Sequence, residues 1–312
     1  MFEFASGSLE KNKIDVINTQ GWFATDFMQK SLTWNIHYIP WFASMHGHEE
    51  NIIEGAWGEE YLQYFNNAMK NTIAKAPKFI YTHEKNLEVF EHFPINEQCK
   101  LISIPTLGMD STLPESNFKS ELNIEKDSFV LGFVARGIEE KGWTEVIETA
   151  KILRKNYKLK IDLVLIGDSE FVQALKDQNK SFSYIHFLGY SDEVLSWGQI
   201  FDVSLLPSFY KSESHPLVIM GYLLCSNPVI TTALGNIPEM IEYNGETAGY
   251  LLQFTQQYRT DPKEIAEIIR KYIKDPLLYK QHRAVARKAF EKFDMKAAAS
   301  KYVEVFNQYA KV

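Results

Sequence analysis

From residue 128 onward, short apolar segments alternate along the chain with longer segments that have the period of an amphipathic helix. Most of the apolar segments are nearly continuous runs of Val, Ile, Leu and Phe, which is typical of strands buried on both faces. This alternation predicts a parallel, doubly wound sheet whose ligands bind at the carboxyl ends of its strands. The strands that we expect are 129–134, 161–167, 184–188, 202–206, 228–231 and 249–252, with a helix at 144–157.

The first hundred residues repeat this rhythm less fully. The segment 105–120 is the best candidate for a linker, because Pro, Gly and Ser are frequent in it. We therefore expect a partial first domain at 1–110, a second domain at 111–292 and a terminal helix at 293–312. The first domain should contain strands at 14–19, 37–46, 78–81 and 101–104 and helices at 22–32, 56–75 and 84–92, and the chain should close with helices at 263–274, 277–290 and 295–310.

The composition leaves room for two α/β domains and argues against one class of partner. The chain has 312 residues, of which 45% are apolar, and a formal net charge of −7. A chain with this charge has no general attraction for nucleic acid, so we expect no nucleic-acid partner. An anionic ligand must therefore be held by a local cluster of donors.

The location that the sequence favours is the cytoplasm. Only two cysteines occur, Cys99 and Cys225, and they are far apart and without metal-ligand spacing, which fits a reducing compartment. The first residues lack the basic and apolar regions of a signal peptide, and no apolar run approaches the roughly 20 residues that span a bilayer. We expect a cytoplasmic protein that can still contact the inner face of the membrane peripherally.

The turn after the strand at 129–134 carries two cations, Arg136 and Lys141. Their spacing of five positions lets both side chains fold over one anion at the ligand-binding edge of the sheet. Arg supplies a planar donor fork and Lys a compact charge, a combination suited to a diphosphate. Two solvated surface charges beside a turn are the alternative, which the spacing alone leaves open.

A second polar cluster, at 207–216, follows the strand at 202–206 and leads into an apolar helix at 217–225. Pro216 suits the first helical turn and Ser214 suits the N-cap. The N–H groups of residues 215–218 then form an anion site at the same edge as Arg136 and Lys141. An ordinary capped, buried helix that binds nothing is the alternative.

Two further segments carry candidate residues. After the strand at 228–231, Gly235 permits close approach of the backbone to a ligand, and Glu239 lies in a first helical turn, where stabilisation of the helix dipole alone would also explain it. In the first domain, His46 and His48 follow a strand, but too few ligands are placed with them for a metal, so we expect no metal site. We expect a catalytic or sugar-contacting role for His46, with a structural histidine as the rival interpretation.

Taken together, these segments resemble the retaining glycosyltransferase family 4 pattern, a GT-B fold (the glycosyl transferases group 1). The resemblance is strong over residues 125–255 and weak toward both ends of the chain. The matching motifs are Phe133-Val-Ala-Arg136, Glu140-Lys-Gly142, Val164-Leu-Ile-Gly-Asp168, His186-Phe-Leu-Gly189, Asp202-Val-Ser-Leu-Leu-Pro-Ser208, Glu213-Ser-His-Pro-Leu-Val-Ile219, Pro228-Val-Ile-Thr231 and Gly235-Asn-Ile-Pro-Glu239.

The resemblance implies two Rossmann-like, doubly wound domains that face a cleft, the N-terminal one incomplete and on the acceptor side, and a last helix that crosses back to it. It implies a nucleotide-sugar donor in the C-terminal domain, whose diphosphate Arg136 and Lys141 neutralise. Glu213 is the first acid of the family's E-x(7)-E signature, and His46 faces the donor sugar. The catalytic residues so implied are His46, Glu213, Arg136 and Lys141, and the donor-binding residues are Arg136, Lys141, Gly189, Glu213, Ser214, His215, Pro216, Leu217, Val218 and Gly235.

Two departures from the family pattern matter. The second acid of the signature, which usually holds the ribose hydroxyls, falls on Gly221. The Gly-rich loop that usually shapes the acceptor site is absent, and the chain enters the first domain late, near 14–18. The chain is then a fragment, a shortened enzyme or a protein that has lost activity.

The function that we expect is transfer of a sugar, with retention, from a nucleoside diphosphate sugar to a glycan or glycolipid acceptor in surface-polysaccharide assembly. No cofactor and no metal is needed, because two cations and a helix N-terminus supply the positive charge. A catalytically degenerate GT-B binding module is the first rival, favoured by Gly221 and the short first domain. A dinucleotide-dependent oxidoreductase is the second, and it fails on the missing G-x-G-x-x-G fingerprint.

Overall fold

The chain divides into two compact units, Met1–Gly108 with Phe293–Val312, and Met109–Lys292. The computed structural model describes residues 15–20, 41–45, 59–60, 63, 78–82, 84–92, 95, 99–104, 108–114, 118–211 and 213–309. The second unit is described almost completely, and each unit contains a parallel sheet. Within the described residues, no helix has both the length and the apolar character required to cross a membrane.

The second unit is built on a six-stranded parallel sheet with the order β12-β9-β8-β5-β6-β7. All six strands predicted from the apolar runs are confirmed, two of them with the same bounds and the others within two residues. The strands are β5 (Phe129–Val134), β6 (Ile161–Ile166), β7 (Ile185–Gly189), β8 (Val203–Leu206), β9 (Val229–Thr232) and β12 (Gly249–Leu252).

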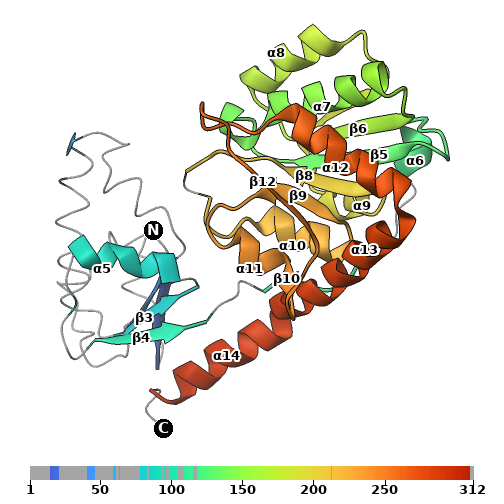
Figure 1. Ribbon diagram of the computed structural model, residues 1–312. Coiled ribbons are helices and arrows are strands. Elements are labelled where there is room, and N and C mark those ends of the chain that lie inside the picture. Colours follow the sequence, from blue (N-terminus) through green and yellow to red (C-terminus); the bar gives the residue numbers. More distant parts are fainter. Residues whose placement is uncertain are drawn as a thin grey trace. The chain divides into compact units, whose positions relative to one another are not determined.

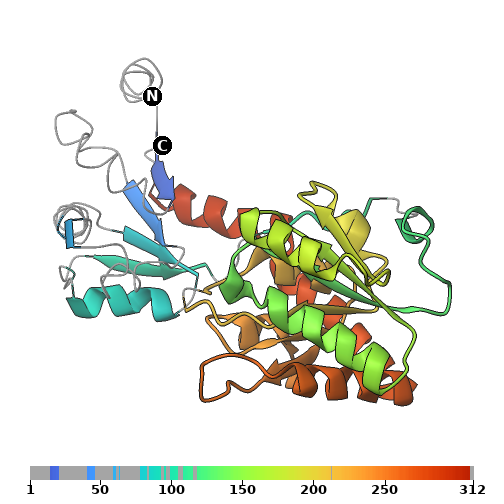
Figure 2. The ribbon, with the colours of Figure 1, turned by 90° about the horizontal axis from the view of Figure 1, so that it is seen from above.

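Helices cover both faces of this sheet (Figure 1). On one face lie α7 (Trp143–Asn156), α8 (Glu170–Asn179) and α12 (Pro262–Lys274), and on the other lie α9 (Val194–Gly198) and α10 (Leu217–Leu224). Figure 2 shows the same layers from above. The remaining elements of the second unit are α6 (Phe118–Glu121), the 3₁₀ helix η2 (Glu139–Lys141), α11 (Ile237–Ile241), β10 (Glu242–Tyr243), β11 (Glu246–Thr247) and α13 (Pro276–Phe290), with the 3₁₀ helix η3 (Glu291–Phe293) at the unit boundary.

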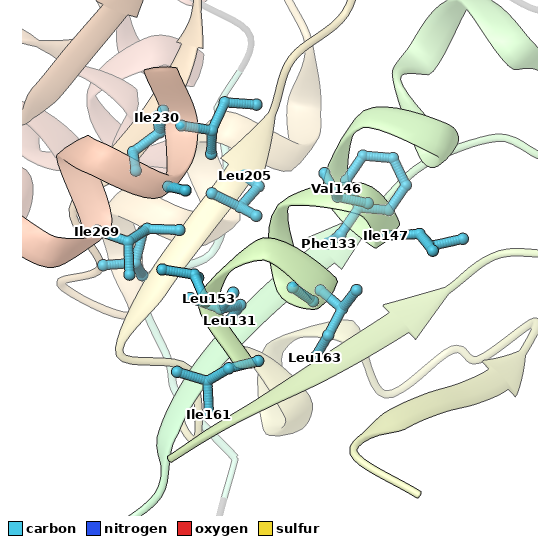
Figure 3. Packing of buried hydrophobic residues seen from close by; sticks show 14 of the residues in the cluster. Leu131, Phe133, Val146, Ile147, Leu153, Ile161, Leu163, Leu205, Ile230 and Ile269 are labelled. Atoms are coloured by element: carbon cyan, nitrogen blue, oxygen red, sulfur yellow. The ribbon is translucent and has the colours of Figure 1, made fainter. Parts of the chain in front are cut away.

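The main core lies between the sheet and the helices α7 and α12 (Figure 3). On α7, Val146, Ile147, Ala150 and Leu153 recur at helical spacing and are all buried. Burial of each aliphatic side chain of this size contributes about 1.5–3 kcal/mol. The opposite face of β5 carries Gly132, where an added Cβ would lie 1.9 Å from the ring of Phe201, so the missing side chain leaves room for that aromatic residue.

The order of the strands creates a switch point between β5 and β8. From β5 the chain proceeds through β6 and β7 toward one edge of the sheet, and it then returns to β8, which pairs with β5 on its other side. The loops that follow β5 and β8 therefore leave neighbouring strands in opposite directions. In open α/β sheets, ligands bind in the crevice that such a divergence opens at the carboxyl ends of the strands.

Within its described residues, the first unit contains a four-stranded parallel sheet in the order β1-β2-β3-β4. Its small core is formed by Phe42, Ile80 and Ile104, and α14 (Met295–Asn307) packs on it, with the Phe306 ring 5.1 Å from that of Phe42. The strands are β1 (Ile17–Gln20), β2 (Trp41–Met45), β3 (Lys78–Tyr81) and β4 (Lys100–Ser103).

The predicted helices of the first unit are only partly described. The helix expected at 84–92 is divided into the 3₁₀ helix η1 (Glu84–Glu88) and α5 (Val89–His92). The helix expected at 22–32 and most of the one expected at 56–75 lie outside the described residues.

Candidate phosphate-binding site at the ends of β5 and β8

Backbone contacts join the loop after β5 to the loop after β8. The N–H of Phe209 donates to the carbonyl oxygen of Glu140 over 2.8 Å. Gly142 has a φ of +90°, and a Cβ at this position would lie 2.7 Å from both the ring and the carbonyl oxygen of Pro207. Only glycine combines this left-handed conformation with such a close approach. The two loops are thus held side by side at the switch point of the sheet.

A buried ion pair connects the same two loops. The Lys141 Nζ atom lies 2.6 Å from Oε2 of Glu213, and both residues are 7% exposed. Removing two charges from water is costly, and good geometry is needed to recover that cost. The pair therefore fixes the direction of the Lys141 side chain. The prediction from sequence placed both residues in one site, but it did not include a direct contact between them.

The second predicted cation, Arg136, is exposed at the start of the same loop. Its guanidinium carbon lies 5.1 Å from the centre of the Tyr210 ring, and the Nζ of Lys141 lies 4.8 Å from it. The carbonyl oxygen of Arg136 accepts a hydrogen bond from the indole N–H of the fully buried Trp143 over 2.9 Å. The backbone of Arg136 is therefore anchored while its charge remains accessible to a ligand.

The start of α10 differs from the prediction. Ser214 is not the N-cap; Pro216 is, with φ −67° and ψ 116°, and no side chain caps this helix terminus. The prediction was wrong because a proline disfavours helical geometry in the residue before it and has no N–H of its own. The helix therefore starts at Leu217, and the donors available at its first turn are the N–H groups of Leu217 and Val218 rather than of all residues 215–218.

The segment 213–215 is held by the turn after β9. The backbone N–H of Asn236 donates to the carbonyl oxygen of Ser214 over 2.7 Å. The side-chain amide nitrogen, Nδ2, of the same residue lies 3.1 Å from Nδ1 of His215. Gly235 has a φ of +54°, and a Cβ there would lie 2.1 Å from the carbonyl oxygen of Glu213. The close approach that Gly235 permits is thus to the protein's own backbone. Glu239 lies in the first turn of α11, as predicted.

Gly189, which belongs to the family pattern, and Gly221, which departs from it, have different surroundings. Gly189 ends β7 with a φ of +75°, and a Cβ there would meet no atom within 4 Å. Gly221, at the position of the second acid, is buried in α10, and its Cβ would lie 3.3 Å from Cδ2 of Leu195 in α9. The helix packs closely on α9 at Gly221, and at this point no acidic side chain reaches out from it.

Three residues that the sequence analysis missed contribute to this region: Phe209, Tyr210 and Arg259. The Arg259 guanidinium lies 4.6 Å from the Phe209 ring and forms ion pairs with Glu139 and Glu145. The aromatic pair in the loop after β8 could have been noted as a possible ligand platform. No local pattern points to Arg259, because it contacts residues more than a hundred positions away.

The histidine candidates fall in two groups. His46 and His48 lie outside the described residues. His186 and His282 pair with Asp162 and Tyr272 at 2.6 and 2.7 Å. Among the described residues, no cluster of three or more His, Cys, Asp or Glu side chains has the geometry to hold a metal ion.

Comparison with known proteins identifies a family match in the second unit and relatives of the chain. Residues 114–292, more than half of the chain, match the family described as glycosyl transferases group 1. N-acetyl-alpha-D-glucosaminyl L-malate synthase from Bacillus anthracis is 28% identical over 197 residues, covering 61% of this chain and 48% of the relative. The capsular polysaccharide biosynthesis glycosyltransferase CapM from Staphylococcus aureus is 28% identical over 217 residues, covering 67% and 53%. The chain spans about half the length of these curated relatives.

Solved structures extend the similarity to nearly the whole chain. Sucrose-phosphate synthase from Thermosynechococcus elongatus aligns with a TM-score of 0.75 and 20% identity, covering 98% of this chain and 76% of that one. HepE from Anabaena in complex with UDP aligns with a TM-score of 0.76 and 18% identity, covering 98% and 82%. Both have the GT-B fold. With the matched motifs at the ends of β5 and β8, these similarities show that the chain has the GT-B fold and belongs to the glycosyl transferases group 1 family.

Proposed function

We propose that the protein transfers a sugar, with retention of configuration, from a nucleoside diphosphate sugar to a glycan or glycolipid acceptor in surface-polysaccharide assembly. Family membership supports sugar transfer. Solved structures of HepE contain UDP or UDP-glucose, and CapM is named for capsular polysaccharide biosynthesis.

The observation that carries the proposal is the cluster of donors at the ends of β5 and β8. Arg136 is exposed beside Lys141, and the uncapped first turn of α10 follows Glu213 by a few residues. A diphosphate bound there would accept hydrogen bonds from the guanidinium, the ammonium and the N–H groups of Leu217 and Val218. Preorganised donors of this kind stabilise negative charge that grows on the leaving nucleotide as the bond to the sugar breaks.

In this mechanism each residue has a defined task. Glu213 holds Lys141 in position and lies next to the donor sugar, and Arg136 grips the phosphate that becomes the leaving group. On the family resemblance alone, we also assign His46 a role in contacting the sugar. The departing diphosphate takes the proton from the acceptor hydroxyl, so no strong base is required. Positioning and charge stabilisation provide the rate enhancement without a cofactor or a metal. We place the reaction in the cytoplasm, with peripheral contact to the inner face of the membrane.

The test is a calorimetric titration of the protein with UDP, GDP, ADP and CMP. We expect one nucleoside diphosphate to bind. Arg136→Ala should lower the affinity for that nucleotide about tenfold or more, as loss of a charge-assisted contact does. Arg270→Ala is the matched control, because this arginine of the same unit pairs with Glu267 in α12 and plays no part in the proposed site. Failure of all four nucleotides to bind contradicts the proposal.

Gly221 favours a second candidate, a GT-B protein that binds a nucleotide-sugar or a partner without transferring the sugar. Position 221 has no side chain, so no acid is available at that point to hold ribose hydroxyls. Incubation with the nucleotide-sugar of the bound nucleotide, with and without glycan acceptors, separates the two candidates. Release of free nucleotide supports the transferase, and binding without release supports the binding protein.

A further inference from the structure

A closed turn after β12 presents Arg259 to the loops of the candidate phosphate site. The N–H of Thr255 donates to the carbonyl oxygen of Arg259 over 2.7 Å, and the N–H of Tyr258 donates back to Thr255 over 3.0 Å. The rings of Phe254 and Tyr258 stack at 4.4 Å, and Phe254 forms a bridge with Thr260. The turn is thus closed by its own backbone and aromatic contacts, which fix the backbone position from which the Arg259 side chain extends.

Arg259 binds two carboxylates that belong to the β5 loop and the helix after it. Its Nε donates to Oε1 of Glu145 and its Nη1 to Oε1 of Glu139, both over 2.6 Å. The Glu145 side chain is 5% exposed and that of Glu139 is 55% exposed, so the guanidinium bridges the interior and the surface. These two residues flank Lys141 in the sequence. The contact therefore restrains the loop on both sides of Lys141.

The same guanidinium reaches the loop after β8. Its carbon lies 4.6 Å from the centre of the Phe209 ring, and the N–H of Phe209 donates to Glu140. Arg259 is therefore in contact with both loops whose junction forms the candidate site. Displacement of a catalytic group by about 1 Å can lower a rate by two orders of magnitude, so a restraint on both loops bears directly on function.

Charge gives a second reason for this contact. The segment 136–145 contains Glu139, Glu140 and Glu145 but only two cations, Arg136 and Lys141. Glu213, which pairs with Lys141, adds a further negative charge. A diphosphate approaching this segment meets a surplus of carboxylates unless cations from elsewhere offset them. Arg259 supplies such a charge to Glu139 and Glu145, the two acids it contacts.

We propose that Arg259 is a positioning residue of the donor-phosphate site, which holds the loop carrying Arg136 and Lys141 through Glu139 and Glu145 and offsets the charge of those two acids. The proposal rests on the proposed function, because it takes the donor phosphates to bind at this loop. It assigns a role to the turn after β12 that neither the family match nor the motifs of the sequence include.

The test compares Arg259→Met and Arg259→Lys with wild type. Arg270→Met is the matched control, because Arg270 also pairs with a glutamate, Glu267, and lies 3.9 Å from an aromatic ring, that of Tyr157. Each protein is titrated with UDP and with UMP. If wild type prefers another nucleoside diphosphate, that diphosphate and its monophosphate are used as well. Hydrogen exchange of segment 136–145 is measured without nucleotide.

We expect Arg259→Met to weaken UDP binding about tenfold and UMP binding less, since the second phosphate adds charge for the uncompensated acids to repel. Segment 136–145 should exchange faster than in wild type, because its restraint is lost. Arg259→Lys should recover part of the affinity, as it keeps the charge but not the two-pronged geometry. Arg270→Met should change neither the affinity nor the exchange of this segment.

Three results overturn the proposal. The first is UDP affinity in Arg259→Met equal to that of wild type. The second is unchanged exchange of segment 136–145, which shows that the contact does not restrain the loop. The third is an equal loss of affinity for UDP and UMP, which is the signature of general destabilisation.

A wild-type protein that binds no nucleotide, with faster exchange in Arg259→Met, instead contradicts the proposed function and leaves Arg259 as a residue that restrains the loop for another purpose. If Arg259→Met fails to fold, Arg259→Lys decides on the same criteria.

Discussion

The six-stranded sheet has a pair of ionisable side chains at each end, partly buried at the amino end and buried at the carboxyl end, and the two pairs have different surroundings. At the amino end, Nε2 of His186 lies 2.6 Å from Oδ1 of Asp162, whose other oxygen accepts a hydrogen bond from Ser128. At the carboxyl end, Nζ of Lys141 lies 2.6 Å from Oε2 of Glu213. The distances are equal, so the pairs alone do not reveal which end binds a ligand.

The difference lies in what surrounds each pair. The carboxylate of Asp162 has both oxygens occupied by protein groups, which completes the amino-end cluster. At the carboxyl end, the pair lies beside the exposed Arg136, the ring of Tyr210 and a helix start that no side chain caps. A buried charge by itself therefore indicates only that its partners are well placed. A binding site is indicated by donors that remain directed outward beside it.

The largest effect should come from breaking the carboxyl-end pair. Lys141→Met leaves the carboxylate of Glu213 buried without its cation, so we expect the free energy of unfolding to fall by about 3–5 kcal/mol. Nucleotide binding should be lost as well. Chemical denaturation measures the first effect and calorimetry the second.

A double variant sharpens this result. Lys141→Met combined with Glu213→Leu removes both charges and should recover most of the stability, but not the nucleotide affinity. Recovery of nucleotide binding in the double variant would show that the pair serves the fold alone, as the pair at the amino end does.

Arg136→Ala should have the next largest effect, and on function only. The side chain is exposed, so we expect no change in the free energy of unfolding. If it stabilises the leaving diphosphate, turnover should fall about a hundredfold or more, as removal of a single transition-state donor does. Steady-state kinetics with the nucleotide-sugar measures this change. Turnover equal to that of wild type would remove Arg136 from the site.

At the amino end, Asp162→Asn should affect stability and leave nucleotide affinity unchanged. We expect a loss of about 1–3 kcal/mol at neutral pH, because Ser128 and His186 lose a charge-assisted acceptor. Equilibrium unfolding in urea, with nucleotide titration in parallel, checks both expectations. A loss of nucleotide affinity without loss of stability would contradict the contrast between the two ends.

The same pair predicts an acid dependence. Burial acts to raise the pKa of Asp162, but the hydrogen bonds from His186 and Ser128 outweigh it, and the net pKa is lowered. A lowered folded-state pKa stabilises the fold above the unfolded value of about 3.9, and this contribution is lost as the pH falls below that value toward the folded pKa. Wild-type stability should therefore decline more steeply than that of Asp162→Asn below about pH 4. Parallel slopes in urea unfolding at a series of acidic pH values would exclude this contribution.

The smallest effect should come from Gly221→Ala in α10. Helix propensity favours alanine by about 1 kcal/mol. The new Cβ would lie 3.3 Å from Cδ2 of Leu195, the end of a flexible side chain that is only half-buried and can move by a few tenths of an ångström. We expect a gain in stability of up to about 1 kcal/mol, measured by thermal denaturation. A loss would indicate that the contact with α9 is rigid.

The elements of the second unit could be predicted because their signals are local. Continuous apolar runs marked all six strands, and the strand-to-helix turns correctly located the loops that carry Arg136, Lys141 and Glu213. The hairpin of β10 and β11 was missed although its turn, Asn244-Gly245 with both φ values positive, has a recognisable sequence signal.

The rest of the site depends on tertiary contacts. The cap of α10 was assigned to Ser214 from residue type, whereas the backbone restriction before Pro216 decides where the helix starts. The close packing of Gly235 on Glu213 and the ion pairs of Arg259 join segments that are distant in the sequence. No periodicity or composition encodes such pairs, so the structure was needed to find them.

The switch point of the sheet also constrains when the site can form. Lys141 and Glu213 are separated by 72 positions, and β6, β7 and the helices between them fill that interval. A chain still emerging from the ribosome can complete β5, β6 and β7 and contain both cations, yet it lacks the carboxylate that orients Lys141. Contacts of this sequence separation form late, because closure of the long loop precedes any gain from the contact. If the proposed phosphate site is correct, it is therefore complete only once β8 has been inserted next to β5.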